Sequence, residues 1–114
     1  MSSVDPIRVG SVSEVPEGEA LLVPAATTGT VPITVFHAED GEFYALDDRC
    51  THGAASLAEG WIEDDQIECP LHGAAFCLRT GAALTLPATV DTRTHRVEVD
   101  GEDLLLYPGT PASS

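Results

Sequence analysis

The sequence predicts a mainly β protein, because short apolar runs alternate with turn-forming residues along most of its 114 residues. Ten glycines and eight prolines lie among these runs, where they favour turns and end regular elements. The sequence contains no long amphipathic helical pattern and no internal repeat. A chain of this length is expected to fold as one domain, residues 1–114.

The expected strands follow one another in short segments with tight connections. Apolar or alternating runs predict strands at residues 7–9, 20–23, 31–38, 43–46, 61–62, 66–68, 75–78, 95–99 and 104–107. Asp40-Gly41 and Asp100-Gly101 predict hairpin tips, because an Asp-Gly pair readily adopts the backbone angles of a tight turn.

Four further expectations concern the segments around these strands. We expect strand 20–23 to be buried and residues 25–30 to form a loop of small side chains. Residues 54–59 are long enough for one helical turn, which Gly60 would end. Residues 108–114 are predicted to be a flexible tail.

The chain is strongly acidic, with 19 acidic and 5 basic residues and a formal net charge of −14. This balance argues against nucleic acid as a partner, because phosphate binding requires clustered cations. Two interpretations of the acidity stay open: it steers the protein toward a basic docking surface, or it only aids solubility.

Neither a membrane span nor a signal peptide is expected. No apolar run approaches the length that a transmembrane helix needs. The first five residues, Met1-Ser2-Ser3-Val4-Asp5, lack the basic and apolar regions of a signal peptide. We therefore expect a cytoplasmic protein.

The chemistry of the chain is concentrated between Cys50 and Gly73. This stretch opens with Cys50-Thr51-His52-Gly53 and closes with Cys69-Pro70-Leu71-His72-Gly73, and sixteen residues (53–68) lie between the two halves. Each half offers one thiolate and one imidazole, so together they can provide four ligands to a metal. The third cysteine, Cys77, leaves an odd and sparse set, which argues against a disulfide scaffold.

This ligand pattern resembles that of the Rieske 2Fe–2S proteins, in which two Cys hold one iron and two His hold the other. The resemblance implies that Cys50 and Cys69 bind one iron of a single 2Fe–2S cluster, and that His52 and His72 bind the second. A zinc site is the alternative, since zinc accepts two Cys and two His. Zinc sites usually pair Cys with Cys and His with His, however, whereas each half here mixes the two.

Residues around the second half make the resemblance more specific. The run from Cys69 to Gly73, together with Phe76, Arg79-Thr80-Gly81 and Pro87, is similar to the Rieske ferredoxins of bacterial aromatic-ring-hydroxylating dioxygenase systems. The resemblance implies a Rieske fold of stacked antiparallel sheets with an inserted cluster-binding subdomain at about residues 47–81. The flanking segments would form the base, and Pro87 would lie in a third loop that covers the cluster.

The same resemblance implies a soluble one-electron carrier that is not itself an enzyme. It would accept electrons from a flavin-dependent NAD(P)H reductase and pass them to a terminal Rieske non-haem iron ring-hydroxylating dioxygenase. In agreement, no second set of catalytic or metal-binding residues is recognisable in the sequence. Two alternatives remain: the small Rieske subunit of an assimilatory NAD(P)H nitrite reductase, and a zinc-binding interaction module.

The mixed ligand set also predicts the electronic behaviour of the site. Two thiolates and two neutral imidazoles leave an oxidised 2Fe–2S core without net charge, whereas four thiolates leave a dianion. A neutral site accepts an electron more easily, which fits potentials of about −150 to +300 mV for Rieske centres and about −400 mV for plant-type ferredoxins. High-potential Rieske proteins carry hydroxyl donors where this chain has Ala74 and Phe76, so we expect the lower part of the range.

Other conspicuous side chains have expected roles in structure. His37 and His95 are expected to be surface or edge residues of strands, and Trp61 to be a core or rim anchor. Cys77 is expected to be a small buried strand residue. An acidic group between the two ligand halves forms either a docking face or a solvated turn, and it comprises Glu59, Glu63, Asp64, Asp65 and Glu68.

Overall fold

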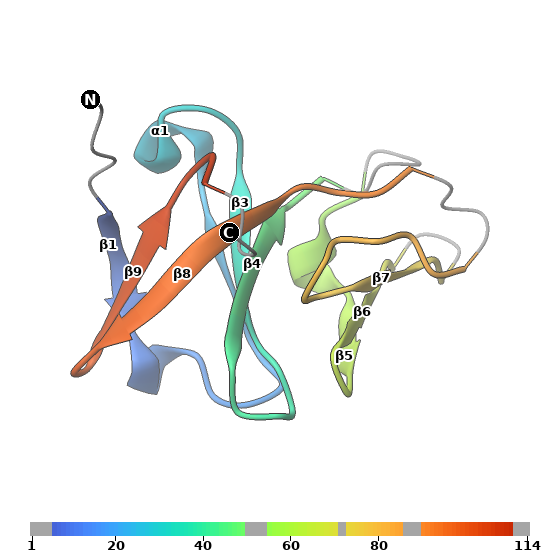
Figure 1. The fold of residues 1–114 in the computed structure, drawn as a ribbon, viewed down its shortest axis with the longest axis horizontal. Coiled ribbons are helices and arrows are strands. Elements are labelled where there is room, and N and C mark those ends of the chain that lie inside the picture. Colours follow the sequence, from blue (N-terminus) through green and yellow to red (C-terminus); the bar gives the residue numbers. More distant parts are fainter. Residues whose placement is uncertain (1–5, 50–54, 71–72, 86–89, 111–114) are drawn as a thin grey trace.

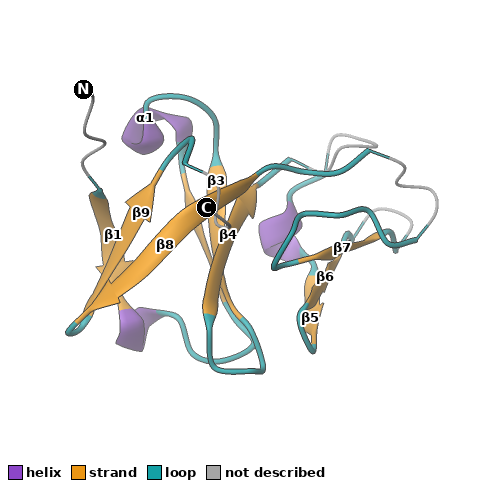
Figure 2. Ribbon diagram, viewed as in Figure 1, coloured by secondary structure: helices purple, strands orange, loops and turns teal. Residues whose placement is uncertain are grey.

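The structure is a computed structural model that describes residues 6–49, 55–70, 73–85 and 90–110. These residues form one six-stranded and one three-stranded antiparallel sheet, with short helical turns between strands (Figures 1 and 2). The prediction of a mainly β fold is therefore confirmed. None of the helices in the described part of the chain has the length and apolarity needed to cross a bilayer.

The six-stranded sheet, which we call the base sheet, has the strand order β1-β9-β8-β4-β3-β2. Its strands are β1 (Ile7–Ser11), β2 (Ala20–Val23), β3 (Ile33–His37), β4 (Phe43–Asp47), β8 (Thr94–Asp100) and β9 (Asp103–Tyr107). Both predicted Asp-Gly turns are confirmed. Gly41 between β3 and β4 has φ 87°, and Gly101 between β8 and β9 has φ 65°.

The three-stranded sheet, which we call the small sheet, is inserted between β4 and β8. It has the order β5-β6-β7 and comprises β5 (Trp61–Glu63), β6 (Gln66–Glu68) and β7 (Ala75–Cys77). Because Leu46 of β4 pairs with Thr94 of β8, the chain leaves the base sheet near Asp47 and returns only at Thr94 (Figure 1). The segment between the two strands therefore carries the whole small sheet.

Three short helical turns connect the strands: η1 (Val12–Glu14), α1 (Ala25–Thr28) and η2 (Leu57–Glu59). The loop that we expected at residues 25–30 contains α1, so that expectation is wrong. Gly29 ends this turn in the left-handed conformation, with φ 82°, and its N–H donates to the carbonyl of Ala25. The helical turn predicted within residues 54–59 is confirmed by η2.

Two apolar cores lie on the two faces of β3 and β4. Alternate side chains of a strand point to opposite faces, so Ile33 and Val35 pack in one core while Phe36 packs in the other. The first core lies within the base and contains Val15, Val23, Ile33, Val35, Ala45, Leu104 and Leu106. The second, which we call the bridging core, joins the base sheet to the small sheet and contains Phe36, Ala38, Leu46, Leu57, Ile67, Cys69, Ala74, Phe76 and Leu78.

His95 is buried in the base, which corrects the expectation of a surface or edge side chain. Only 1% of it is exposed. Its Nδ1 accepts a hydrogen bond from the backbone N–H of Gly109 at 2.9 Å, so the ring proton lies on Nε2 and is donated to Asp47 at 2.7 Å. The carbonyl of Thr110 also accepts the N–H of Arg96 at 2.7 Å. Gly109 and Thr110 are thus hydrogen-bonded to the base sheet, and residues 111–114 of the predicted flexible tail lie outside the described part.

Two other burial expectations are wrong. Strand β2 lies at an edge of the base sheet, and Leu22 at its centre is 47% exposed, so the strand is not buried. Trp61 is 60% exposed and contributes little to either core. His37 is half-buried, stacks on Phe43 and has its Nδ1 2.8 Å from the carbonyl oxygen of Val15.

Gly60 lies where the small sheet starts. A substitution at this position tests how tightly the region is packed. A Cβ at residue 60 would lie 2.0 Å from the carbonyl oxygen of Glu68, which directly precedes Cys69. We expect Gly60→Ala to lower the free energy of unfolding by about 3 kcal/mol, because backbone at both sides of the clash must move. Urea denaturation measures this change.

The matched control is Gly18→Ala. Gly18 has φ 88° and open space where a Cβ would lie, so the substitution costs only the backbone strain of about 1 kcal/mol. Equal destabilisation by the two substitutions would contradict the close packing of Gly60 against β6.

Candidate metal centre

Cys69 is the predicted ligand that the structure describes; Cys50, His52 and His72 lie outside the described residues. Cys69 directly follows β6 and is fully buried. Its N–H donates to the carbonyl of Ala74 at 2.6 Å. The second ligand loop is therefore closed at its base by a short backbone hydrogen bond between the residues at its two ends.

The turn that closes this loop requires a glycine at position 73. Gly73 has φ 71°, which is the left-handed region that side chains with a Cβ rarely adopt. Space is not the constraint, since a Cβ there would have its nearest neighbour, a Glu68 carboxylate oxygen, at 3.7 Å. The backbone angle thus explains the glycine that follows His72 in the sequence.

The described ends of all three loops pack against the bridging core. Cys69 and Ala74, at the two ends of the second ligand loop, belong to it. Ala55, at the end of the first loop, and Ala83, which precedes the third, pack against it. Phe76 and Ala74 are fully buried there and offer no hydroxyl group, as the sequence indicated. One apolar cluster therefore fixes where all three loops begin or end.

Asp48 closes the base of the first ligand loop. The residue is 7% exposed, and its Oδ1 accepts hydrogen bonds from the hydroxyl groups of Thr34 (2.6 Å) and Ser56 (2.8 Å) and from the N–H of Ala58 (3.0 Å). Arg49 and Ser56 face each other in an isolated β-bridge. Sequence analysis did not identify Asp48, because burial of an aspartate has no local sequence signal.

The third loop, which contains Pro87, is tied near its start to β7, which follows the second ligand loop. Thr85 accepts the N–H of Ala75 at 2.9 Å, and the N–H of Leu84 donates to the carbonyl of Ala75 at 2.8 Å. Asp91 accepts the N–H of Ala83 at 2.8 Å and so joins the two sides of this loop. Pro87 itself lies outside the described residues.

These surroundings fit an iron–sulfur cluster. A buried thiol beside an apolar core suits a cluster, because limited solvent access protects the metal and controls its potential. Gly73, just before Ala74, has left-handed backbone angles and no side chain that would obstruct a ligand. Within the described ranges, no group of three or more His, Cys, Asp or Glu is arranged to hold a metal.

Comparison with known proteins decides the family. The sequence profile of the Rieske [2Fe-2S] domain matches residues 5–96. The chain belongs to the Rieske [2Fe-2S] domain family. This membership confirms the predicted Rieske fold and the prediction of one Rieske-type 2Fe–2S cluster as cofactor.

Individual relatives of this Rieske domain are ferredoxins of dioxygenase systems. The chain is 51% identical over 96 residues to the 3-phenylpropionate/cinnamic acid dioxygenase ferredoxin subunit of Shigella boydii serotype 4 (strain Sb227), which covers 83% of this chain and 86% of the relative. It is 35% identical to a chain in the complex of reduced oxygenase and oxidized ferredoxin in carbazole 1,9a-dioxygenase, with TM-score 0.84 over 96% and 97% of the two chains. The Sphingomonas yanoikuyae B1 ferredoxin has 31% identity and TM-score 0.82 over 90% and 98% of the two chains.

One structural neighbour bears on an alternative function. The putative NADH-dependent nitrite reductase small subunit from Mycobacterium tuberculosis has TM-score 0.77 over 89% of this chain and 92% of its own, but only 17% identity. At that identity the likeness shows a shared fold alone.

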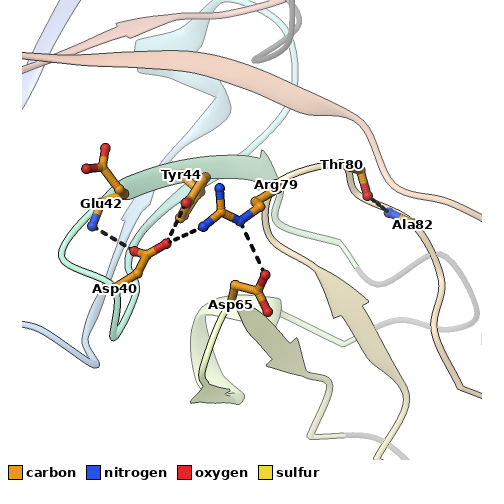
Figure 3. Close-up of polar contacts among 7 residues, drawn as sticks. All are labelled: Asp40, Glu42, Tyr44, Asp65, Arg79, Thr80 and Ala82. Carbon is orange, nitrogen blue, oxygen red and sulfur yellow. Dashed lines mark hydrogen bonds and ion pairs between the residues drawn. The ribbon is translucent and has the colours of Figure 1, made fainter.

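A polar cluster, which we call the clasp, fixes the small sheet of the Rieske domain against the base sheet (Figure 3). Arg79, just after β7, donates to Asp40 at 2.9 Å and to Asp65 at 3.3 Å. Asp40 lies in the β3–β4 hairpin of the base, and Asp65 in the β5–β6 turn. The hydroxyl group of Tyr44 donates to Asp40 at 2.8 Å, and the Arg79 guanidinium lies 5.7 Å from the centre of the Tyr44 ring. Three segments far apart in sequence are thereby held together.

The clasp shifts the protonation equilibria of two of its members. The backbone N–H of Glu42 and the hydroxyl group of Tyr44 both donate to Asp40, which lowers the pKa of that carboxyl group. Burial of the phenol, followed by its hydrogen bond to Asp40, raises the pKa of Tyr44 to about 12. Asp40 therefore stays anionic, and Tyr44 stays uncharged, at pH values near 7.

Part of the acidic group between the ligand halves lies away from Cys69. Glu63, Asp64 and Asp65 lie at the turn of the β5–β6 hairpin, whereas Cys69 follows the other end of β6 (Figure 1). Asp65 pairs with Arg79, and the N–H of Asp64 donates to Glu39 at 2.6 Å. These three residues are thus better described as an exposed turn that contacts the base hairpin.

Substitution of single cysteines tests the assignment of Cys69. We expect Cys69→Ser to abolish the 2Fe–2S EPR signal of the reduced protein and to lower bound iron and sulfide, because a buried thiolate ligand is lost. Cys77→Ser is the matched control, since Cys77 is half-buried in β7 only eight residues further along. Loss of the signal in Cys77→Ser, or its retention in Cys69→Ser, would contradict the assignment.

Alkaline titration tests the clasp. A folded-state pKa near 12 for Tyr44, above the unfolded value of about 10, contributes stability that is complete below pH 10 and is lost as the pH rises toward 12. In a Tyr107→Phe background, which leaves one tyrosine, we expect Asp40→Asn to move phenolate formation to lower pH. An unchanged phenolate titration would show that Asp40 does not hold the Tyr44 proton.

Proposed function

We propose that this Rieske protein is the one-electron carrier of a multicomponent aromatic-ring dioxygenase system. The observation that carries this proposal is its 51% identity to a dioxygenase ferredoxin subunit, because the match spans most of both chains. A small protein that matches a ferredoxin along most of its length is an electron-transfer component rather than a catalytic subunit.

We assign Cys50 and Cys69 to one iron of the cluster and His52 and His72 to the other. The spacing of the four residues and the burial of Cys69 support this assignment. When bound, the cluster supplies the redox chemistry by accepting and releasing one electron. The chain holds Cys69 in an apolar environment, fixes the loop bases, and uses the clasp to hold the small sheet in one orientation.

The proposed partners are a flavin-dependent NAD(P)H reductase as donor and a terminal Rieske non-haem iron oxygenase as acceptor. The likeness to the ferredoxin in the oxygenase–ferredoxin complex of carbazole 1,9a-dioxygenase supports an oxygenase as acceptor. We propose a cytoplasmic location, where NAD(P)H is available. Neither alternative function has comparable support, since the nitrite reductase subunit shares only the fold and the family itself carries 2Fe–2S clusters rather than zinc.

Electron delivery to an oxygenase tests this function. The purified protein is first reduced with dithionite, and EPR together with iron and sulfide analysis establishes the cluster. Excess dithionite is then removed, and the protein is mixed with the terminal oxygenase of the 3-phenylpropionate/cinnamic acid dioxygenase system. We expect each cluster to give up one electron to an oxygenase centre, followed as loss of the reduced-ferredoxin EPR signal.

Cys69→Ser is the control without a cluster and should reduce no oxygenase. A wild-type protein that holds the cluster but stays reduced in the presence of the oxygenase would contradict the proposed carrier role. As a positive control, the 3-phenylpropionate/cinnamic acid dioxygenase ferredoxin subunit replaces this protein in the same mixture. Its oxidation verifies that the oxygenase can accept electrons.

A further inference from the structure

Asp48 is not one of the four assigned cluster ligands, yet its buried side chain makes several hydrogen bonds beside the first ligand loop. Asp48 lies two residues before Cys50, and two residues of backbone span at most about 7 Å. We propose that Asp48 is the positioning residue of the first ligand loop: it joins the described ends of the segment that carries Cys50 and His52, and its negative charge disfavours reduction of the cluster. This inference rests on the ligand assignment within the proposed function.

One set of contacts fixes Asp48 to the base sheet. Its Oδ1 accepts the hydroxyl group of Thr34 at 2.6 Å, and Thr34 in β3 is fully buried. Its N–H donates to the carbonyl of Pro32 at 3.0 Å. Because β3 lies between β2 and β4 within the sheet, the carboxylate is attached to one of the most constrained strands of the protein.

A second set of contacts captures the far end of the loop. The same Oδ1 accepts the hydroxyl group of Ser56 at 2.8 Å and the N–H of Ala58 at 3.0 Å. The backbone carbonyl of Asp48 accepts the N–H of Leu57 at 2.7 Å. Residues on both sides of the ligand loop are therefore joined through one residue, and the loop ends cannot separate without breaking these bonds.

The chemistry of the contacts favours a carboxylate at this position. Hydrogen bonds to an ionised acceptor are stronger than those between neutral groups, and here three donors share one oxygen. Removing the acceptor would leave the buried Thr34 hydroxyl group without this partner, and buried polar groups without partners are costly. Asparagine retains an acceptor oxygen in the same place but carries no charge, so it separates the geometric effect from the electrostatic one.

A fixed negative charge also opposes the addition of an electron nearby. Because Asp48 is buried and close in sequence to Cys50, screening by solvent is weak there. The charge and the hydrogen bonds of Asp48 thus affect different measurable properties: the charge affects the reduction potential, and the hydrogen bonds affect retention of the cluster.

Four variants test the proposal on the cluster-loaded protein: Asp48→Ala, Asp48→Asn, Ser56→Ala and the control Asp100→Asn. Asp100 lies at the exposed β8–β9 hairpin, so the control removes the same charge at the opposite end of the molecule (Figure 1). The first measurement is the rate at which a ferrous-iron chelator removes iron from the reduced protein, and the second is the reduction potential by voltammetry.

We expect Asp48→Ala to lose iron about tenfold faster than the wild type, because strong hydrogen bonds that close the loop are gone. Ser56→Ala, which removes one of these bonds, should give a smaller acceleration. Asp48→Asn should retain the cluster better than Asp48→Ala, with a reduction potential above that of the wild type. Asp100→Asn should match the wild type in both measurements.

Wild-type iron retention in both Asp48→Ala and Ser56→Ala would overturn the positioning role, and an unchanged potential in Asp48→Asn would overturn the electrostatic one. If Asp48→Ala does not fold by circular dichroism, Ser56→Ala and Asp48→Asn decide the proposal alone. The test reads cluster retention rather than electron delivery. A protein that holds its cluster but reduces no oxygenase therefore contradicts the proposed function without changing the result for Asp48.

Discussion

The packing of the small sheet on the base sheet is the constraint on which the metal centre depends. Phe36 and Leu46 of the base meet Ile67 and Phe76 of the small sheet in the bridging core, and Cys69 belongs to the same core. Burial of apolar surface at this junction is the main favourable term that holds the two sheets together. Since the ends of the ligand loops also pack on the bridging core, the loops cannot be displaced without disturbing that core. The position of the metal centre is thus a consequence of how the two sheets pack.

Polar contacts add the precision that apolar packing lacks. Hydrophobic burial is not directional, whereas the Asp48 carboxylate, the Cys69–Ala74 hydrogen bond and the clasp each fix a particular geometry. An electron carrier benefits from such fixation, because a site that is already arranged needs little rearrangement when its charge changes by one. The clasp lies at the other end of the β5–β6 hairpin from Cys69, so the small sheet is held at both ends.

The sequence reveals this fold wherever the signal is local. Asp-Gly turns, alternating runs and the spacing of Cys and His are each read within a few residues, and the turns and the family were predicted correctly. The wrong expectation for His95 and the unforeseen contacts of Asp48 and Arg79 concern partners distant in sequence, whereas α1 is a local element that the sequence did not predict. Asp47 and His95 are 48 residues apart, Asp40 and Arg79 are 39 apart, and Thr34 and Asp48 are 14 apart. The burial of His95 and Asp48 results from these long-range pairings, as does the return of the chain to the base sheet only at β8. No local sequence pattern predicts these features.

The placement of the arginines refines the meaning of the large negative charge. Four of the five arginines pair with carboxylates of the same chain: Arg8, Arg79, Arg93 and Arg96. Arg49, which precedes Cys50, is exposed and makes no ion pair with any described residue. The cations thus serve mainly to join segments of the fold, and the exposed surface is left predominantly acidic. Long-range attraction to a basic partner would therefore come from the molecule as a whole, while the immediate edge of the first ligand loop presents a positive charge. A docking surface that includes this loop must then complement both negative and positive charge. This charge pattern, in addition to the net charge, would favour one orientation of the complex.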